Sequence, residues 1–386
     1  MSLDGDCSNG QNNTNGRGEH AIFERLPIPP PQVYNGARLE TSYVRQFLVD
    51  PRNPANIKTK DSLAPILLSS SGNSYQFDTI LRMEAALGGS VHVGFMCETL
   101  SPPIDNGRIV ITHQWTTPDI RKVAIKTASL KKWMDSSIHK SENPATEISL
   151  NQILGNNPFL PNFIESCVHS QKNGNGTVYM IFEFIEGGDL MDYIDRMPSE
   201  DVSRNIFTQI VRGVQFLHMN SICHRDLSLE NIMFNPKTMT VKIIDLGMAI
   251  QAQKKENSLI HEFEYLKAQP SCGKLSYMAP EIISMMDHRP DKADVWTLGV
   301  ILFALITCGA SVLDVKGACY LDDRFRRLQK SQLNEMINES MSDINRKASI
   351  EIKDLLNKML KINIDERCTL NQIINHPWLL GQSTYE

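Results

Sequence analysis

The stretch HRDLSLEN, residues 224–231, decides the fold class of this 386-residue chain. It places the carboxylate of Asp226 five positions before the amide of Asn231. Carboxylate and amide oxygens are the ligands that a hard cation such as Mg²⁺ prefers in proteins. Ser228 stands between them, where a loop that handles a negatively charged group would gain more from a cation than from a hydroxyl. A positive charge at the place of Ser228 would therefore have to come from another part of the chain.

Strand-like patterns precede helical patterns along the chain. From about residue 75 onward, four segments read as strands: TILRMEAAL (79–87), SVHVGFM (90–96), RKVAIKTA (121–128) and TVYMIFEFI (177–185). A turn with two glycines follows at 187–188, and helical spacing then dominates in 203–220, 296–307 and 348–360. One earlier helix is predicted at 146–154, and two short strands at 232–234 and 241–245. The sequence predicts an α+β fold with a small antiparallel-sheet lobe that contains one main helix, a larger helical lobe, and a cleft between them.

Composition narrows the class of protein. The net charge is 39 − 44 = −5, which argues against a broad electrostatic grip on nucleic acid or on an anionic membrane. The eight cysteines show no zinc-ligand spacing, so we expect a reducing, intracellular compartment, either cytoplasmic or nuclear. The most apolar stretch, Leu298–Leu313, is too short for a comfortable membrane span and is expected to be a buried core helix.

Three regions are expected along the chain. Residues 1–74 begin with a polar, Asn- and Gly-rich segment and are predicted to be disordered or extended. Residues 75–185 form the small lobe, with a long insertion near 98–120, and residues 186–386 form the large lobe. Within the insertion, the turn-rich ETLSPPIDNGR (98–108) is expected to be a solvent loop, whereas RIVITHQW (108–115) is expected to extend the hairpin.

Five motifs follow one another in a fixed order: VAIK (123–126), Glu147 on the predicted helix, HRDLSLEN (224–231), DLG (245–247) and APE (279–281). A lone HRD or APE would be weak evidence, but the ordered set is specific. The sequence resembles the eukaryotic protein kinase superfamily, of the serine/threonine type, over roughly residues 75–380. DVW (294–296) and NHPWL (375–379) are further features of that resemblance.

The resemblance implies a role for each matching residue. Lys126 would hold the α- and β-phosphates of ATP, and Glu147 would pair with Lys126 and fix it. Asp226 would orient the acceptor hydroxyl or take its proton. Asn231 and Asp245 would hold Mg²⁺.

The same resemblance assigns the nucleotide pocket and three structural residues. Phe182 would guard the back of the adenine pocket, Glu183 and Ile185 would present backbone groups to adenine, and Asp189 would bind the ribose. Two segments have names in this family: the catalytic loop, here residues 224–231, and the activation segment, here residues 245–281. Asp294 would brace the catalytic loop. The ion pair Glu281–Arg367 would tie the activation segment to the large lobe.

The loop that covers the phosphates departs from the family pattern G-x-G-x-x-G-x-V. In one register Gly89 is the third glycine and Val91 is the valine over adenine, so that Glu84 and Ala86 occupy the first two glycine positions. A second register puts Gly88 at the second glycine and Val93 at the valine. Side chains at these positions hinder the approach of backbone N–H groups to phosphate. The loop therefore predicts either weak ATP binding or a pseudokinase.

A second departure concerns the missing charge beside Asp226. Serine/threonine members usually carry Lys at the position of Ser228 and Thr at the position of Lys274, in CGKLSYMAPE (272–281). The hydroxyl and the ammonium are thus both present but exchanged. We expect Lys274 to reach in from the activation segment and supply the charge near the γ-phosphate, the alternative being that it points to solvent.

Regulation rests on weaker signals. Arg225 precedes the catalytic aspartate, as in kinases whose activation loop is phosphorylated. Ser258, Tyr265 and Ser271 are candidate phosphorylation sites in the segment 245–281.

The resemblance implies a protein serine/threonine kinase that uses ATP and Mg²⁺ and acts on protein substrates, with no nucleic-acid or membrane partner. The alternatives are a nucleotide-binding pseudokinase scaffold and a binding module in which residues 1–74 carry the function. The sequence leaves the oligomeric state and the physiological substrate open.

Overall fold

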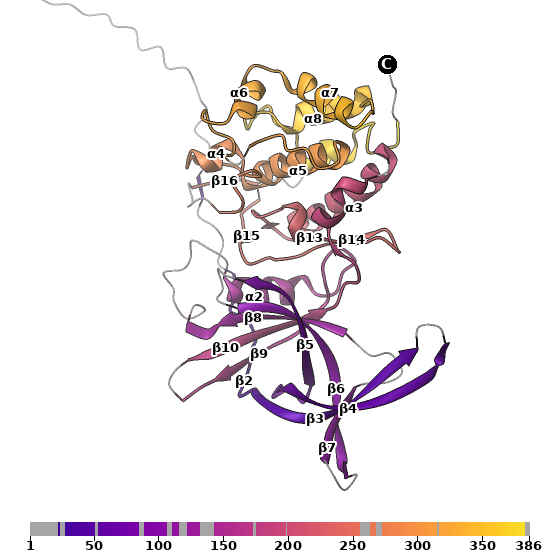
Figure 1. Ribbon diagram of the computed structural model, residues 1–386. Helices are drawn as coiled ribbons and strands as arrows, with labels where there is room; N and C mark the ends of the chain where they lie inside the picture. Colours follow the sequence, from indigo (N-terminus) through magenta and orange to yellow (C-terminus); the bar gives the residue numbers. More distant parts are fainter. Residues whose placement is uncertain are drawn as a thin grey trace, which may run out of the picture.

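The structure is a computed structural model with two lobes stacked on one another (Figure 1). It describes residues 22–23, 28–50, 53–84, 89–105, 110–115, 122–131, 143–172, 175–197, 199–254, 263–267, 272–314 and 316–382. The small lobe is mainly a β-sheet and the large lobe is mainly helical. The predicted two-lobed α+β fold is confirmed.

A nine-stranded sheet forms the small lobe, in the order β2-β9-β10-β8-β6-β5-β4-β3-β7. Its strands are β2 (Tyr34–Asn35), β3 (Arg38–Asp50), β4 (Asn53–Leu68), β5 (Ser74–Glu84), β6 (Gly89–Asp105), β7 (Val110–Trp115), β8 (Lys122–Ser129), β9 (Phe163–Ser170) and β10 (Gly176–Glu183). All neighbouring pairs are antiparallel except β2–β9 and β3–β7. The four strands predicted from about residue 75 onward correspond to β5, β6, β8 and β10.

The outer strands of this sheet close on themselves. β7 pairs with β3 on one side and with the second half of β6 on the other, so β3, β4, β5, β6 and β7 make a five-stranded barrel. Its interior is apolar and contains Val44, Ala64, Ile66, Phe95 and Cys97. The barrel joins the rest of the lobe through β6, whose first half pairs with β8.

The barrel differs from two expectations. The boundary expected at residue 74 falls inside the sheet, because β3 and β4 pair along their whole length and β4 continues into β5. The solvent loop expected at 98–108 is wrong in part, because β6 runs on to Asp105. Pro102 and Pro103 are accommodated because they lie in an irregularity of the β6–β7 ladder between Thr99 and Ile104, where proline costs no ladder hydrogen bond. The predicted extension of the hairpin by 108–115 corresponds to β7.

The main helix of the small lobe, α2 (Pro144–Leu154), lies between the sheet and the large lobe (Figure 1). Asn143 caps it by accepting a 2.9 Å hydrogen bond from Ala145 N–H, and a proline follows at the first helical position, as helix starts favour. Ile148 packs against the sheet, and Leu150 and Leu154 pack into the large-lobe core. The predicted helix at 146–154 therefore exists and begins two residues earlier.

Helices of the large lobe surround α5 (Pro290–Ile306), which is buried on nearly every side. The other helices are α3 (Glu200–Met219), α4 (Pro280–Ile283), α6 (Asp323–Gln329), α7 (Leu333–Asp343), α8 (Ile350–Met359) and α9 (Leu370–Ile374). Trp296 of α5 and Phe207 of α3 are fully buried in this core. Of the core helix expected at Leu298–Leu313, residues 298–306 belong to α5, whereas residues 307–313 lie beyond its end and are not helical. Within the described residues, none of the helices combines the length and hydropathy that crossing a membrane requires.

Short strands position the loops between the lobes. β11 (Gly188–Asp189), β13 (Ile232–Asn235) and β14 (Thr240–Ile243) form one sheet, and β12 (Ile222–Cys223) pairs with β15 (Ile250–Gln251). Near the N-terminus, β1 (Ile22–Phe23) pairs in parallel with β16 (Tyr265–Leu266). Two 3₁₀ helices, η2 (Leu190–Arg196) and η3 (Leu229–Asn231), complete the described elements around the cleft.

Candidate active site

A cavity of about 340 Å³ opens between the lobes. Val91 and Ala124 line it from the small lobe, and Met233 and Ile243 line it from the large lobe. Apolar side chains above and below a cleft suit a flat aromatic ligand. The lining also contains most of the residues predicted to bind the nucleotide, namely Val91, Lys126, Phe182, Glu183, Ile185 and Asp189, whereas the predicted Gly89 is not a lining residue.

Three charged groups meet at the inner end of this cavity. Lys126 Nζ lies 2.8 Å from Glu147 Oε2 and 3.1 Å from Asp245 Oδ1. These side chains come from β8, from α2 and from the loop after β14, and all three are at most 6% exposed. Screening by water is weak at such a site, so the ammonium is firmly oriented between the two carboxylates. The sequence-predicted Lys126, Glu147 and Asp245 are thus brought together.

The catalytic-loop residues lie beside this cluster. Asn231 Nδ2 donates to the Asp226 backbone carbonyl at 2.8 Å and to Asp226 Oδ2 at 2.9 Å. Asp226 Oδ1 is buried and has no hydrogen-bond partner among the residues that the structure describes. Burial is the largest influence on this carboxyl and raises its pKa above the ordinary value, and nearby Asp245 raises the pKa further. Asp226 therefore has one oxygen atom that no hydrogen bond from the described residues occupies.

Two backbone conformations around this site are strained. Arg225 has a φ of 68° and Asp245 a φ of 69°, values that side chains other than glycine rarely adopt. Such strain persists only where the surroundings hold it, and it clusters at functional sites. Both residues adjoin the site, one just before Asp226 and the other at the Lys126 cluster.

The donor set at the inner end of the cavity fits a Mg²⁺ ion. Because Asn231 uses its Nδ2 on Asp226, its Oδ1 is left as an acceptor. The Ile244 N–H donates to the Asn231 carbonyl at 3.0 Å, which keeps Asn231 and Asp245 on neighbouring chains. A carboxylate and an amide oxygen are hard ligands, and Mg²⁺ completes its shell with water and substrate phosphates. Asn231 and Asp245 would hold the ion.

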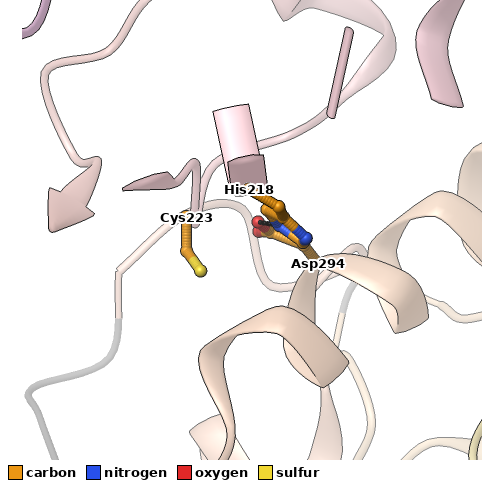
Figure 2. A group of neighbouring side chains, drawn as sticks. All are labelled: His218, Cys223 and Asp294. Carbon is orange, nitrogen blue, oxygen red and sulfur yellow. Dashed lines mark hydrogen bonds and ion pairs between the residues drawn. The ribbon is translucent and has the colours of Figure 1, made fainter. Parts of the chain in front are cut away.

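Asp294 of α5 lies beside His218 (Figure 2) and accepts hydrogen bonds from the catalytic-loop backbone. Its Oδ2 accepts from His218 Nε2 at 2.8 Å and from the His224 N–H at 3.0 Å, and its Oδ1 accepts from the Arg225 N–H at 3.0 Å. Burial alone would raise the pKa of Asp294, but these hydrogen bonds and the nearby histidines outweigh it and hold the pKa below the ordinary value. The carboxylate therefore fixes the backbone just before Asp226.

The same carboxylate belongs to a buried group, His218, Cys223 and Asp294, with possible ligand atoms within 4.8 Å of one another (Figure 2). Both Asp294 oxygens are already occupied by the hydrogen bonds above. Burial also raises the pKa of the Cys223 thiol well above its ordinary value, so the thiolate that a metal would need is disfavoured. We interpret the group as a structural brace and not as a metal site.

The exchanged pair predicted from the sequence lies in contact. Lys274 Nζ donates to Ser228 Oγ at 2.8 Å and lies 3.1 Å from Glu230 Oε1. Its charge reaches Asp226, because it lowers the pKa of that carboxyl against the larger effect of burial. Sequence reasoning missed Glu230, although its place in HRDLSLEN, beside Asn231, was a signal that it would face the cleft.

A buried ion pair anchors the activation segment to the large lobe. Arg367 donates two hydrogen bonds to Glu281, at 2.6 Å and 2.9 Å, and its guanidinium lies over the ring of Trp296. Arg367 also donates to the backbone carbonyls of Lys292 and Lys361. The predicted Glu281–Arg367 pair is thus present and fully hydrogen-bonded.

The described residues include the end of the glycine-poor loop, where β6 begins. A Cβ atom on Gly89 would lie 1.9 Å from the Thr127 carbonyl oxygen, so only glycine fits there. Val91 pairs with Lys126 and lines the cavity, whereas Val93 packs into the barrel. This arrangement favours the register with Gly89 and Val91. Gly88 lies outside the described residues.

The remaining predicted residues have other partners. The Glu183 side chain pairs with Lys242 and accepts from Asn162 at 3.0 Å, and Asp189 caps η2 by accepting from the Asp192 N–H at 3.1 Å. Among the regulatory candidates, Ser258 and Ser271 lie outside the described residues. Tyr265 lies in β16 and donates to Asp365 at 3.0 Å. Arg225 donates to the Met248 carbonyl at 3.5 Å.

Comparison with known proteins places this site in a family. The chain matches a family model described as protein kinase domain over residues 109–379, well over half of its length. The match begins after β6, so the glycine-poor loop lies outside it.

Curated relatives are kinases as well. The chain is 27% identical over 346 residues to protein kinase kin1 of Schizosaccharomyces pombe, which covers 86% of this chain and 35% of that protein. It is 34% identical over 207 residues to the human SNF-related serine/threonine-protein kinase, covering 53% of this chain and 24% of that protein. It is 33% identical over 203 residues to the SNF1-related protein kinase catalytic subunit alpha KIN12 of Arabidopsis thaliana, covering 52% of this chain and 36% of that protein. The chain spans about a third or less of the length of these relatives. With the ordered motifs, the two-lobed fold and the matching family model together, this chain belongs to the eukaryotic protein kinase superfamily.

Proposed function

We propose that this protein is a serine/threonine kinase that transfers the γ-phosphate of ATP to hydroxyl groups of protein substrates. The observation that carries the proposal is the buried cluster of Lys126, Glu147 and Asp245 beside Asp226 and Asn231. Phosphoryl transfer requires positioning and charge neutralisation more than covalent chemistry, and this cluster supplies both. The names of the relatives support the serine/threonine preference.

Each residue has a defined task in the proposed reaction. Lys126 binds the α- and β-phosphates and is held by Glu147. Asn231 and Asp245 hold Mg²⁺, which when bound neutralises charge on the phosphates. The nucleotide base lies between Val91, Ala124 and the strand β10, with Phe182 at the back, the Glu183 and Ile185 backbone along its edge, and Asp189 near the ribose.

The free oxygen of Asp226 receives the acceptor hydroxyl. The hydroxyl oxygen forms a bond to the γ-phosphorus, the bond from that phosphorus to the β–γ bridging oxygen breaks, and ADP leaves with the bond's electron pair. The hydroxyl proton passes to Asp226. The raised pKa of this carboxyl makes it a better proton acceptor than an ordinary aspartate.

Lys274 supplies a positive charge next to the γ-phosphate in this proposal. Its contacts with Ser228 and Glu230 orient the ammonium toward the catalytic loop, as the lysine two places after the aspartate would do in the usual arrangement. The loop is therefore competent although its own lysine is missing.

A transfer assay tests the function. The full chain is incubated with labelled ATP, Mg²⁺ and a mixture of generic protein substrates, and ATP binding is measured separately. We expect labelled serine or threonine in the products, with loss of labelling in Asp226→Asn, which keeps the shape of the side chain. Transfer equal in the wild type and Asp226→Asn would contradict the proposal. ATP binding without transfer would indicate a nucleotide-binding scaffold instead.

The seven cysteines that the structure describes carry free thiols. We propose a reducing compartment, cytoplasmic or nuclear, on this ground.

A further inference from the structure

A short N-terminal segment, residues 28–37, lies against α2 and the open edge of the small-lobe sheet. Its strand β2 pairs in parallel with β9, with Tyr34 opposite Cys167 and Asn35 opposite Val168. The Ala37 N–H then donates to the Val168 carbonyl at 3.1 Å. Val33 packs against the cluster that includes Ile148 of α2. We call residues 28–37 the N-terminal strap.

A reciprocal pair of hydrogen bonds joins the strap to α2. The Gln32 backbone N–H donates to Gln152 Oε1 at 2.9 Å, and Gln152 Nε2 donates to the Gln32 carbonyl at 2.7 Å. The same carbonyl accepts from Ser166 Oγ of β9 at 3.1 Å. The Gln152 amide therefore occupies the place that a neighbouring strand would take beside Gln32, and it connects the helix to the sheet edge.

The helix held in this way carries Glu147. At its start, the Asn143 N–H donates to the Gly247 carbonyl of the DLG motif at 2.9 Å. Near its end, Gln152 binds the strap. Between these two attachments Glu147 reaches Lys126. Leu150 and Leu154 also hold the helix by packing into the large-lobe core, and the strap adds a polar attachment near its end that opposes a rotation of Glu147 away from Lys126.

The chain just before the strap reaches the activation segment. In β1, Ile22 pairs with Tyr265 and Phe23 with Leu266. Leu266 also exchanges two backbone hydrogen bonds with His288, at 2.7 Å and 3.0 Å. Residues 22–23 therefore contact the activation segment, and the strap contacts the helix that carries Glu147.

We propose that Gln152 is a positioning residue: by binding the backbone of Gln32 it ties α2 to the N-terminal strap and so keeps Glu147 in contact with Lys126. This inference rests on the proposed kinase function for its catalytic consequence, but not for its structural one. Because both residues are exposed and the two bonds are neutral, their effect is modest.

Three full-length variants isolate the pair. Gln152→Leu keeps the aliphatic stem and a good helix former but loses both hydrogen bonds. Gln32→Pro removes the backbone donor. Gln32→Ala is the matched control, because it changes the Gln32 side chain and leaves both backbone groups in place. A thermal unfolding scan establishes that each variant is folded.

The kinetic readout is kcat/KM for ATP. We expect about a fivefold loss for Gln152→Leu, equivalent to about 1 kcal/mol, a loss in the same direction for Gln32→Pro, and no change for Gln32→Ala. In a Glu147→Gln background, Gln152→Leu should cause no further loss, because its effect passes through Glu147. Equal losses in both backgrounds would overturn the positioning role.

Amide hydrogen exchange supplies a readout that needs no activity. We expect faster exchange in α2 and in residues 34–37 for Gln152→Leu and Gln32→Pro, and unchanged exchange for Gln32→Ala. Exchange identical in all three variants would overturn the proposal. If the wild type transferred no phosphate but showed this exchange pattern, the proposed function would fail while the strap would stand.

Discussion

Lys274 of the activation segment donates a 2.8 Å hydrogen bond to Ser228 of the catalytic loop, so the two residues that appear exchanged in the sequence meet in space. The activation segment thereby places an ammonium beside the position at which the catalytic loop has Ser228 in place of lysine. Under the proposed function, correct placement of the segment also completes the active site.

The exchange predicts a rescue by double substitution. Lys274→Ala should lower kcat about tenfold, because a partly exposed cation near the transferred phosphate is lost. The double variant Ser228→Lys with Lys274→Thr restores the usual arrangement and should recover most of the activity. Steady-state kinetics of the single and double variants check this. Near-wild-type kcat in a folded Lys274→Ala would show that the ammonium takes no part.

The raised pKa of Asp226 predicts that replacing its carboxyl group by an amide stabilises the folded protein, and that the gain depends on pH. Burial raises this pKa in the folded protein, so the stability contributed by the protonated carboxyl is present below the ordinary value of 3.8 and is lost as the pH rises through the raised value. Asp226→Asn stays neutral and should unfold at a higher temperature than the wild type at pH 7, without nucleotide. The difference should shrink as the pH falls toward 4. A variant less stable at pH 7 would contradict the prediction.

The buried ion pair predicts a large loss of stability. Arg367→Ala leaves the buried Glu281 unpaired and should lower the unfolding free energy by roughly 3–5 kcal/mol. Arg327→Ala is the matched control, because Arg327 makes a similar two-bond contact with Glu339, with both hydrogen bonds at 2.7 Å, but on the surface. Urea denaturation should show little change for the control. Similar losses in both variants would mean that burial is not the cause.

The phosphate-covering loop predicts opposite effects at two positions. Gly89→Ala places a methyl group against the Thr127 carbonyl, and the distortion should cost about 1–3 kcal/mol and raise KM for ATP. Ala86→Gly, which returns a glycine to the family pattern, should lower KM for ATP. ATP titrations of both variants check the pair. An unchanged KM in Gly89→Ala would place the loop away from the nucleotide.

Local signals were enough for much of the architecture. The capped, proline-started helix α2, the core helix α5 and the strands β8 and β10 follow directly from spacing and apolar runs. The meeting of Lys126, Glu147 and Asp245 could be expected because each residue belongs to a motif with a fixed place in the fold.

Non-local pairing explains what the sequence did not reveal. β4 contains two prolines and many polar residues, and it becomes a strand only because β3 and β5 provide partners. The two-residue strand β1 is too short to carry a pattern of its own and depends on β16. The contacts of Glu183 with Lys242 and of Lys274 with Glu230 join residues whose charges predict no particular partner.

The closed barrel has a consequence for behaviour at high concentration. Sheet edges with unpaired N–H and C=O groups are templates on which a second chain can add a strand and begin to aggregate. In the described part of the chain, one side of the nine-stranded sheet curls back on itself through the β7 contacts, and the other side ends in the two-residue strand β2. Strand addition to the small lobe is therefore expected at the outer part of the β3–β4 hairpin, because in the described pairings residues 46–50 and 53–60 pair only with each other, and not within the closed barrel.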